Sequence, residues 1–164
     1  MRWKTLVAAA ALVVAATLVA GAATAGSAAS KTKRQRITIV LDDSANPSTF
    51  VLTPLTAGPI RQDSGQWSAC CWTNRSVTRD GQSVDIDNPK LTFKGQNGTF
   101  TWRARITFVD LDNDYTVATA VWKITRGTGA YAHLEGHGRQ AFVEKTDGTA
   151  KLADQAQGIV DLGR

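Results

Sequence analysis

Hydrophobic and polar residues alternate with a period of two along much of the chain, and the spacing typical of amphipathic helices does not recur. The clearest case is residues 99–108, where hydrophobic side chains fall on one face and polar side chains on the other. Because successive side chains of a strand point to opposite faces of its sheet, this segment predicts a half-buried antiparallel strand. Its hydrophobic face would consist of Phe100, Trp102, Ala104, Ile106 and Phe108.

Further short segments are rich in β-branched or aromatic residues and short enough to be strands. They span residues 36–41, 49–53, 90–93, 115–125 and 139–144. Hairpin-turn pairs, which reach the positive φ angles of tight turns, occur at Asp80-Gly81, Asn97-Gly98 and Asp147-Gly148. The polar run Asp110–Asp114 predicts a fourth reversal.

Strands joined in sequence by short turns predict a single all-β domain with an antiparallel up-and-down sheet. Such a sheet loses its exposed edges most simply by closing, so we expect a calycin-like β-barrel of about eight strands. A β-sandwich is the main alternative.

The start of the chain has the pattern of an export signal. Two basic residues precede an apolar run from Leu6 to Ala20, and small-residue cleavage motifs end at Ala25 and Ala29. Residues 1–29 are therefore predicted to be the signal peptide of a secreted protein, and their alanine-rich composition is typical of bacterial leaders. The alternative is an uncleaved signal that anchors the protein in a membrane.

The net charge of +5 is concentrated before the predicted barrel. Residues 30–36 form a basic segment that we expect to be a flexible leader, and residues 37–164 are the expected barrel domain. From Ile37 onward 13 basic residues face 14 acidic ones, which argues against a basic nucleic-acid-binding face. The leader could instead contact an anionic envelope surface.

The stretch Arg126–Arg139 is dense in glycine and in chemically active residues. A phosphate-binding loop would have to open a helix, and no helical stripe follows these glycines. A metal site could use His133, Glu135 and His137, which would share one face of a strand, but both histidines could not easily reach one ion. The interpretation that explains most residues is a tight turn that leads from one strand to the next.

The segment "ITRGTGAYAHLEGHG" resembles the signature of small eight-stranded barrels of the allene oxide cyclase and dirigent type, and the likeness extends over Leu91–Glu144. The resemblance implies a barrel whose lumen takes a small apolar or phenolic molecule, and relatives in these families catalyse cyclisations or steer radical coupling. Their polar catalytic residues do not map onto positions of this chain, so the resemblance carries over the fold only.

The only two cysteines, Cys70 and Cys71, are adjacent and flanked by Trp67 and Trp72. In an exported protein they could form a strained vicinal disulfide, remain buried as two thiols, or pair between molecules. On a regular strand Trp67 and Cys71 would share one face and Trp72 would lie on the other, so both tryptophans could not face inward. The candidate ligand-binding residues are Trp67, Cys71, Phe93, Phe100, Trp102, Trp122 and Tyr131.

Three functions follow from these features. The first is an exported barrel that binds a small hydrophobic or aromatic molecule in its lumen, and it would fail if side chains filled the lumen completely. The second is a cofactor-independent cyclase or isomerase, which requires converging polar groups and a perturbed acid or base. The third is an envelope structural or interaction protein. No sequence motif calls for a cofactor, and the sequence does not fix an oligomeric state.

Overall fold

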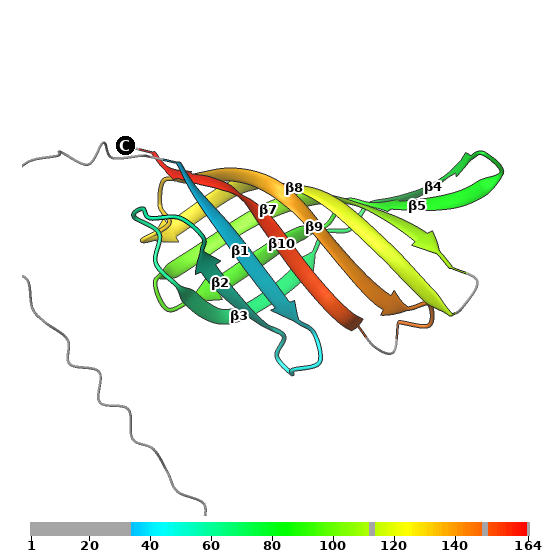
Figure 1. Ribbon diagram of the computed structural model, residues 1–164, viewed down its shortest axis with the longest axis horizontal. Coiled ribbons are helices and arrows are strands. Elements are labelled where there is room, and N and C mark those ends of the chain that lie inside the picture. The colour runs from blue at the N-terminus through cyan, green and yellow to red at the C-terminus, as the bar shows by residue number, and fades with distance from the viewer. Residues whose placement is uncertain (1–33, 112–113, 149–150, 164) are drawn as a thin grey trace, which may run out of the picture. The chain divides into compact units, whose positions relative to one another are not determined.

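The computed structural model describes residues 34–111, 114–148 and 151–163, which form ten β-strands (Figure 1). Within these ranges there is no helix. The strands are β1 (Arg34–Asp42), β2 (Thr49–Pro54), β3 (Asp63–Cys70), β4 (Asn74–Arg79), β5 (Gln82–Asp87), β6 (Lys90–Gly95), β7 (Gly98–Asp110), β8 (Tyr115–Gly129), β9 (Leu134–Lys145) and β10 (Lys151–Leu162).

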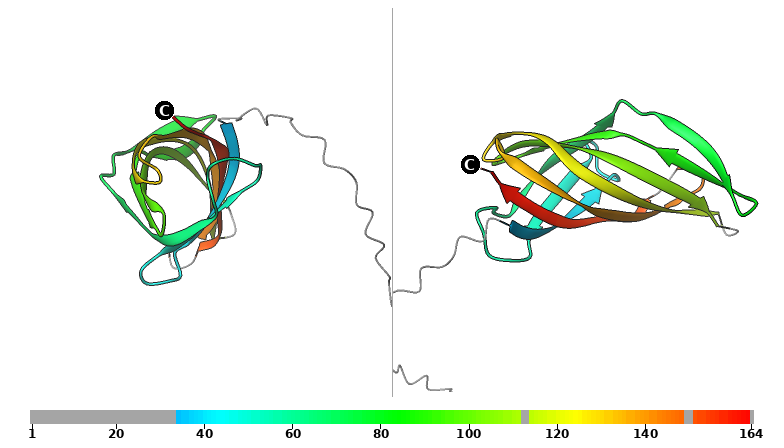
Figure 2. Two further views of the ribbon diagram at one scale, coloured as in Figure 1. Left: turned by 90° about the vertical axis from the view of Figure 1, so that its left-hand side faces the viewer. Right: turned by 90° about the horizontal axis from the view of Figure 1, so that it is seen from above.

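Eight of these strands form a closed antiparallel barrel, and β4 and β5 are additional. Each barrel strand pairs with its neighbours in sequence, with β6 following β3, and β1 pairs with β10 to close the ring. The view along the barrel in Figure 2 shows this closed ring. The predicted up-and-down barrel is therefore confirmed, and the β-sandwich alternative is not observed.

The hairpin of β4 and β5 is inserted between β3 and β6 and extends beyond the barrel (Figure 1). Its turn is the predicted pair Asp80-Gly81, with φ angles of 51° and 80°. Only the base of β5 joins the sheet, where Asp85–Asp87 pair with Ile106–Phe108 of β7. Because β6 pairs with the first part of β7, the hairpin covers the remainder of that strand's edge.

The other predicted turns are also confirmed. Asn97-Gly98 connects β6 to β7. Asp114, which has a φ of 62°, lies between β7 and β8, and residues 112 and 113 of that predicted reversal lie outside the described residues. Gly148, with a φ of 71°, lies in the turn after β9. The predicted strand face is confirmed as well, because Phe100, Trp102 and the alternate residues after them point into the barrel core.

The expected boundary at Ile37 is wrong, because β1 begins at Arg34. Gln35 is 1% exposed, and its side-chain amide donates to the carbonyl oxygens of Thr56 and Ile60 and accepts from the Ile60 amide. These bonds fasten the loop between β2 and β3 to the first strand. The last three residues of the expected leader therefore belong to the barrel.

The predicted signal peptide and the start of the basic leader, residues 1–33, lie outside the described residues. In the described ranges, no helix is long and apolar enough to cross a membrane.

Aromatic side chains fill one half of the barrel lumen. Phe93 stacks on Phe100 with ring centroids 4.7 Å apart, and Trp102 stacks on Trp122 at the same separation. Phe93 also meets Trp102 at 4.4 Å. All four side chains are at most 3% exposed, so they form a packed core.

Glycines on β9, the strand paired with β8, and on β10 beyond it make room for this aromatic core. A Cβ atom at Gly138 of β9 or at Gly158 of β10 would collide with the indole ring of Trp122. Because these glycines have no side chain, the indole ring of Trp122 can pack directly against the backbone of β9 and β10.

Candidate functional site

The stretch Arg126–Arg139 closes one end of the barrel. β8 runs to Gly129, a turn follows, and β9 begins at Leu134, so the predicted strand-to-strand turn is confirmed. Gly127 lacks the Cβ that would collide with the carbonyl oxygen of Tyr131, and Gly129 has a φ of 61°. Tyr131 is 2% exposed and Leu134 is 5% exposed, which confirms that both return to the core.

The Asp63 carboxylate holds the closed end together. It is 3% exposed and accepts hydrogen bonds from the backbone amides of Ser64, Gln96 and Asn97 at 2.8, 2.9 and 3.2 Å. The Tyr131 hydroxyl donates a fourth bond of 2.7 Å. Burial, together with the hydrogen bond to Asp63, raises the pKa of Tyr131 far above its usual range. Both oxygens of the buried Asp63 carboxylate therefore have hydrogen-bond partners.

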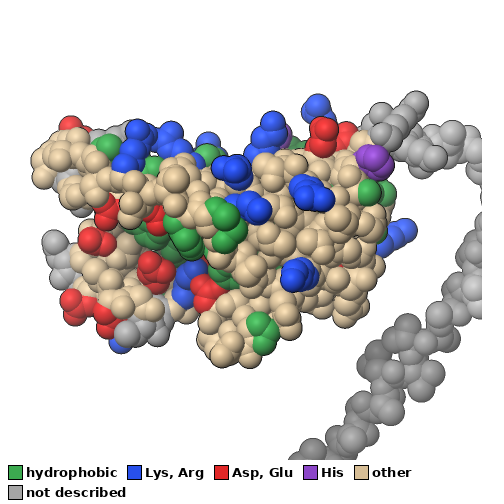
Figure 3. Space-filling model, turned by 180° about the vertical axis from the view of Figure 1, so that it is seen from behind, with side chains coloured by type: hydrophobic (Ala, Val, Ile, Leu, Met, Phe, Trp, Pro, Cys, Tyr) green, Lys and Arg blue, Asp and Glu red, His purple; other side chains and the backbone are tan. Residues whose placement is uncertain are grey.

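At the opposite end, a cavity of about 250 Å³ enters the lumen. Its aromatic walls are Trp67, Trp72, Phe108 and Phe142. In Figure 3, the face opposite to that of Figure 1 is hollowed, and hydrophobic side chains in the hollow lie beside acidic and basic ones. The barrel is thus filled at one end and open at the other, the arrangement by which small barrels admit one small ligand.

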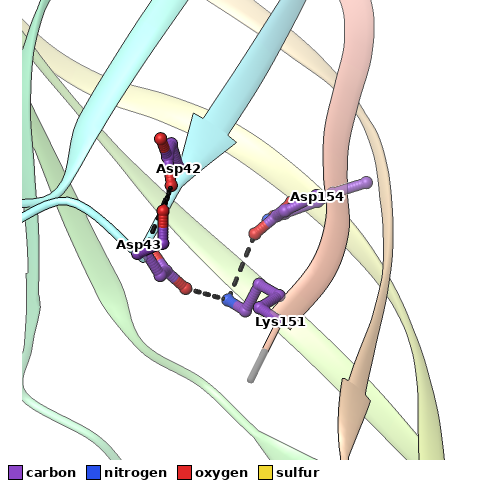
Figure 4. A network of polar contacts seen from close by, with 6 residues as sticks. Asp42, Asp43, Lys151 and Asp154 are labelled. Atoms are coloured by element: carbon purple, nitrogen blue, oxygen red, sulfur yellow. Dashed lines mark hydrogen bonds and ion pairs between the residues drawn. The ribbon is translucent and has the colours of Figure 1, made fainter. Parts of the chain in front are cut away.

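The partly buried ammonium group of Lys151 lines this cavity, and Figure 4 shows its ion pairs. The Lys151 Nζ atom is 2.5 Å from Asp43 Oδ2 and 3.3 Å from Asp154 Oδ2. It also lies 4.4 Å from the centroid of the Phe142 ring and 5.8 Å from that of Trp67. Burial alone would lower the pKa of Lys151, but the hydrogen bonds and charges of the two aspartates outweigh burial and raise it.

Three carboxyl groups around the cavity have raised pKa values. Burial is the main cause at Asp154, where the Gln140 hydrogen bond and the Lys151 charge only partly offset it. Burial also raises the pKa of Glu144, against the attraction of Lys151, and that of Asp87, which Asp85 repels. Perturbed acids in a cleft are a recognised feature of functional sites.

Polar atoms at this end lack hydrogen-bond partners. Gln140 is 4% exposed; its Nε2 donates to Asp154 Oδ1 at 2.6 Å, but its Oε1 has no partner among the described residues. Trp67 Nε1 is likewise buried without a described partner. An unpaired buried polar group costs about 1–3 kcal/mol, so both atoms are sites where a ligand would gain a hydrogen bond.

The structure places the predicted ligand-binding residues in different parts of the barrel. Cys71 is solvent-exposed and is not among the residues that line the open cavity. Trp67 lines the open cavity. Phe93, Phe100, Trp102 and Trp122 belong to the packed aromatic core, and Tyr131 belongs to the closed end.

Trp72 corrects an expectation about the cysteine segment. Regular alternation placed Trp72 on the face opposite to Trp67, but both tryptophans line the same cavity. The reason is that β3 ends at Cys70 and Cys71 takes a φ of 62°, which reverses the side-chain alternation. Cys70 and Cys71 are exposed free thiols, and a hydrogen bond with Cys71 raises the pKa of Cys70. The vicinal disulfide stays a prediction.

The histidine-rich face lies away from the cavity. His133 is in the turn before β9, and Glu135 and His137 point outward from β9, where all three are exposed. In the parts of the chain that the structure describes, no three His, Cys, Asp or Glu residues are arranged to hold a metal ion.

Sequence reasoning missed the polar residues of the cavity. Gln140 and Glu144 share the inward parity of Phe142, and Asp154 shares that of Ala156. Polar residues at inward positions of amphipathic strands were the available signal. Their convergence with Lys151 and Asp43 depends on three distant segments and has no local signature.

A larger hollow of about 870 Å³ lies against the outward side chains of β7–β10, among them Val121, Arg105 and Arg139. These three side chains are solvent-exposed, so this hollow is a groove on the outer surface. The lumenal cavity is the better candidate site, because it combines four aromatic walls with the buried carboxylate of Asp154 and the ammonium of Lys151.

Comparison of the chain with protein-family models, curated proteins and solved structures finds no match. Fold and site alone therefore define its class. It is a small closed antiparallel β-barrel with one plugged end and a cavity that opens at the other.

Proposed function

We propose that the protein is exported and binds a small molecule with an aromatic or apolar body in the open end of its barrel. The observation that carries the proposal is the cavity of about 250 Å³ between the aromatic core and the Lys151 network. A lumen filled completely by side chains would argue against a binding barrel. Here the core leaves a cavity in the lumen, which supports the proposal. The signal-peptide pattern supports export, and the resemblance to allene oxide cyclase and dirigent barrels supports a lumenal ligand.

The first test looks for a retained ligand. Native mass spectrometry of the protein, purified from culture medium without denaturation, should detect added mass that is lost when the protein unfolds. If the purified protein carries no added mass, binding is tested with an added probe. 4-Phenylbutan-1-ol is suitable because it is neutral and lacks tryptophan-like fluorescence.

A cavity-filling variant then locates the site. Ala69 lines the cavity, so Ala69→Phe should weaken binding of 4-phenylbutan-1-ol on the order of tenfold, measured by calorimetry or tryptophan fluorescence. Ser68→Phe is the matched control, because Ser68 is the neighbouring residue and is exposed on the outer face. Equal binding by both variants, or no binding by the unmodified protein, would contradict the proposal.

A cofactor-independent cyclase or isomerase is the second candidate, favoured by the buried charges. The Lys151 ammonium could stabilise negative charge that develops on a substrate oxygen, and burial raises the pKa of Glu144, which favours a carboxyl group that can donate a proton. Both lie beside aromatic walls suited to an apolar substrate.

The test of catalysis uses stereochemistry. Incubation with an achiral epoxide of the allene oxide type should give a cyclised product of one handedness if the cavity controls the reaction. Glu144→Gln should then return the product to a racemate, whereas Glu135→Gln on the outer face should not. A racemic product from the unmodified protein would leave binding as the function.

A further inference from the structure

The open-end cavity contains more negative than positive groups. Asp87, Glu144 and Asp154 line it together with one cation, Lys151. The charge of Lys151 is already engaged, since it forms ion pairs with Asp43 and Asp154. Across the described ranges, neither Asp87 nor Glu144 has an ion-pair partner. Two carboxyl groups of the cavity therefore lack a direct ion pair and can meet a ligand.

The polar groups of the cavity wall that lack hydrogen-bond partners are also mainly acceptors. Gln140 is fixed by its bond to Asp154, which leaves the unpartnered Oε1 as an acceptor at the cavity wall. Together with the carboxylates of Asp87 and Glu144, it offers three acceptor groups. The only unpartnered buried donor on the wall, among the residues described, is Trp67 Nε1. A ligand that fits this wall must mainly donate hydrogen bonds.

The aromatic walls favour a cation as well. The electron-rich faces of aromatic rings attract ammonium groups within about 6 Å. The cavity already shows this chemistry, because Lys151 Nζ lies 4.4 Å from the Phe142 centroid and 5.8 Å from that of Trp67. Trp72 and Phe108 complete the walls with further apolar ring surface.

We propose that the ligand class of this cavity is an organic amine, bound as its ammonium ion with an aromatic or alkyl body between the rings. The inference rests on the proposed binding function and specifies its ligand. The ammonium would donate to acceptors among Gln140 Oε1 and the carboxylates of Glu144 and Asp87, which all line the cavity, while Lys151 stays paired with Asp43 and Asp154. A carboxylate ligand would face the two free carboxyl groups without an available counter-charge.

The raised pKa values of Glu144 and Asp87 agree with this ligand. Burial holds both carboxyl groups partly toward their neutral form in the empty cavity, and an adjacent ammonium would favour the ionised form. Lys151, Asp43 and Asp154 face Glu144, and Asp85 faces Asp87. Amine binding at mildly acidic pH should therefore release protons, whereas binding of a neutral analogue should not.

The experiment compares three probes that differ only in the end group: 4-phenylbutylamine, 4-phenylbutan-1-ol and 4-phenylbutanoate. Calorimetric titration of the purified protein should give the order amine, alcohol, acid, with the amine at least about tenfold tighter than the alcohol. Titration of the amine in buffers of different ionisation enthalpy should detect the proton release.

The double variant Asp87→Asn, Glu144→Gln should reduce the preference for amine over alcohol about tenfold. The matched control is Asp80→Asn, Glu135→Gln, which removes the same charge from the hairpin tip and the outer face of β9. Thermal unfolding verifies that both variants fold, and proton release by the unmodified protein supplies a readout that needs no variant.

The outcomes separate the two proposals. An alcohol or acid that binds as tightly as the amine, or an amine preference that survives in the double variant, would overturn the amine assignment but leave the binding function intact. Failure of all three probes to bind would overturn both.

Discussion

At the closed end of the barrel the Asp63 carboxylate accepts four hydrogen bonds, whereas at the open end the Gln140 Oε1 atom accepts none from the described residues. Both side chains are more than nine-tenths buried. At the closed end, backbone amides and the Tyr131 hydroxyl satisfy the Asp63 carboxylate. The open end distributes its charges around a cavity bounded by Trp67 and Trp72.

This difference distinguishes buried polar groups that stabilise the fold from those that are available to bind a ligand. A buried polar group with all its partners stabilises a single packing arrangement, while one without partners costs free energy in the empty protein. The same strands, β9 and β10, contribute to both ends, so fold alone does not determine the difference. What differs is whether neighbouring backbone groups are placed to satisfy the side chains.

The largest effect is expected at the closed end. Asp63→Ala should lower the free energy of unfolding by about 3 kcal/mol, because it leaves the Tyr131 hydroxyl and backbone amides buried without an acceptor. Urea unfolding measures the change. Asp42→Ala is the control, since Asp42 is exposed and bonds only to the nearby Ser44 and Ala45. Equal effects of the two substitutions would contradict the assignment of Asp63 as a structural plug.

A smaller effect is expected from Lys151→Met at the open end. Removing the ammonium leaves Asp43 and Asp154 side by side without a counter-charge, which should cost about 2 kcal/mol at neutral pH. Because the pKa of Lys151 is raised on folding, its contribution is fully present below the ordinary lysine pKa and disappears as the pH rises through the folded value.

Urea unfolding of both proteins from neutral to strongly alkaline pH tests this. The gap in stability between unmodified protein and variant should narrow only in the alkaline range. A gap that is constant with pH would mean that the alkyl chain of Lys151, packed on Phe142, provides the stability instead of its charge.

Glu144→Gln should have a smaller effect of the opposite sign. Burial raises the pKa of Glu144, so the ionised form costs stability above the folded pKa and this cost disappears as the pH falls through it. The variant should therefore be more stable at neutral pH, by less than about 1 kcal/mol, and lose that advantage in acid. Thermal unfolding at both pH values checks the sign, and a variant less stable than the original at neutral pH would contradict it.

Much of the barrel could be predicted from sequence, because alternation and hairpin turns are local signals. The strand through Phe100 and Ile106 and the turn at Asp80-Gly81 are such cases. The position of the β4–β5 hairpin was harder to predict from sequence. Its strand β5 does not pair with the next strand along the chain, β6, but with β7.

The site was less predictable for two physical reasons. Trp72 joins Trp67 only because Cys71, a residue that rarely adopts positive φ, breaks the alternation. Lys151, at the start of β10, reaches Asp43, just after the end of β1, and that contact requires closure of β1 on β10. Residue pattern predicts which face a side chain occupies, but three-dimensional closure decides which charges meet.

The smallest effect is expected at Cys70 and Cys71, beside the mouth of the cavity. Both thiols are exposed, and the proposed export to an oxidising exterior should close them into a disulfide. A disulfide between adjacent residues closes a very small loop and so restricts the unfolded chain little. Its reduction should therefore lower the free energy of unfolding by less than about 1 kcal/mol. Mass spectrometry after iodoacetamide treatment, with and without reductant, tests the bond. Labelling of both thiols without reductant would contradict it and leave Trp72 positioned by backbone geometry alone.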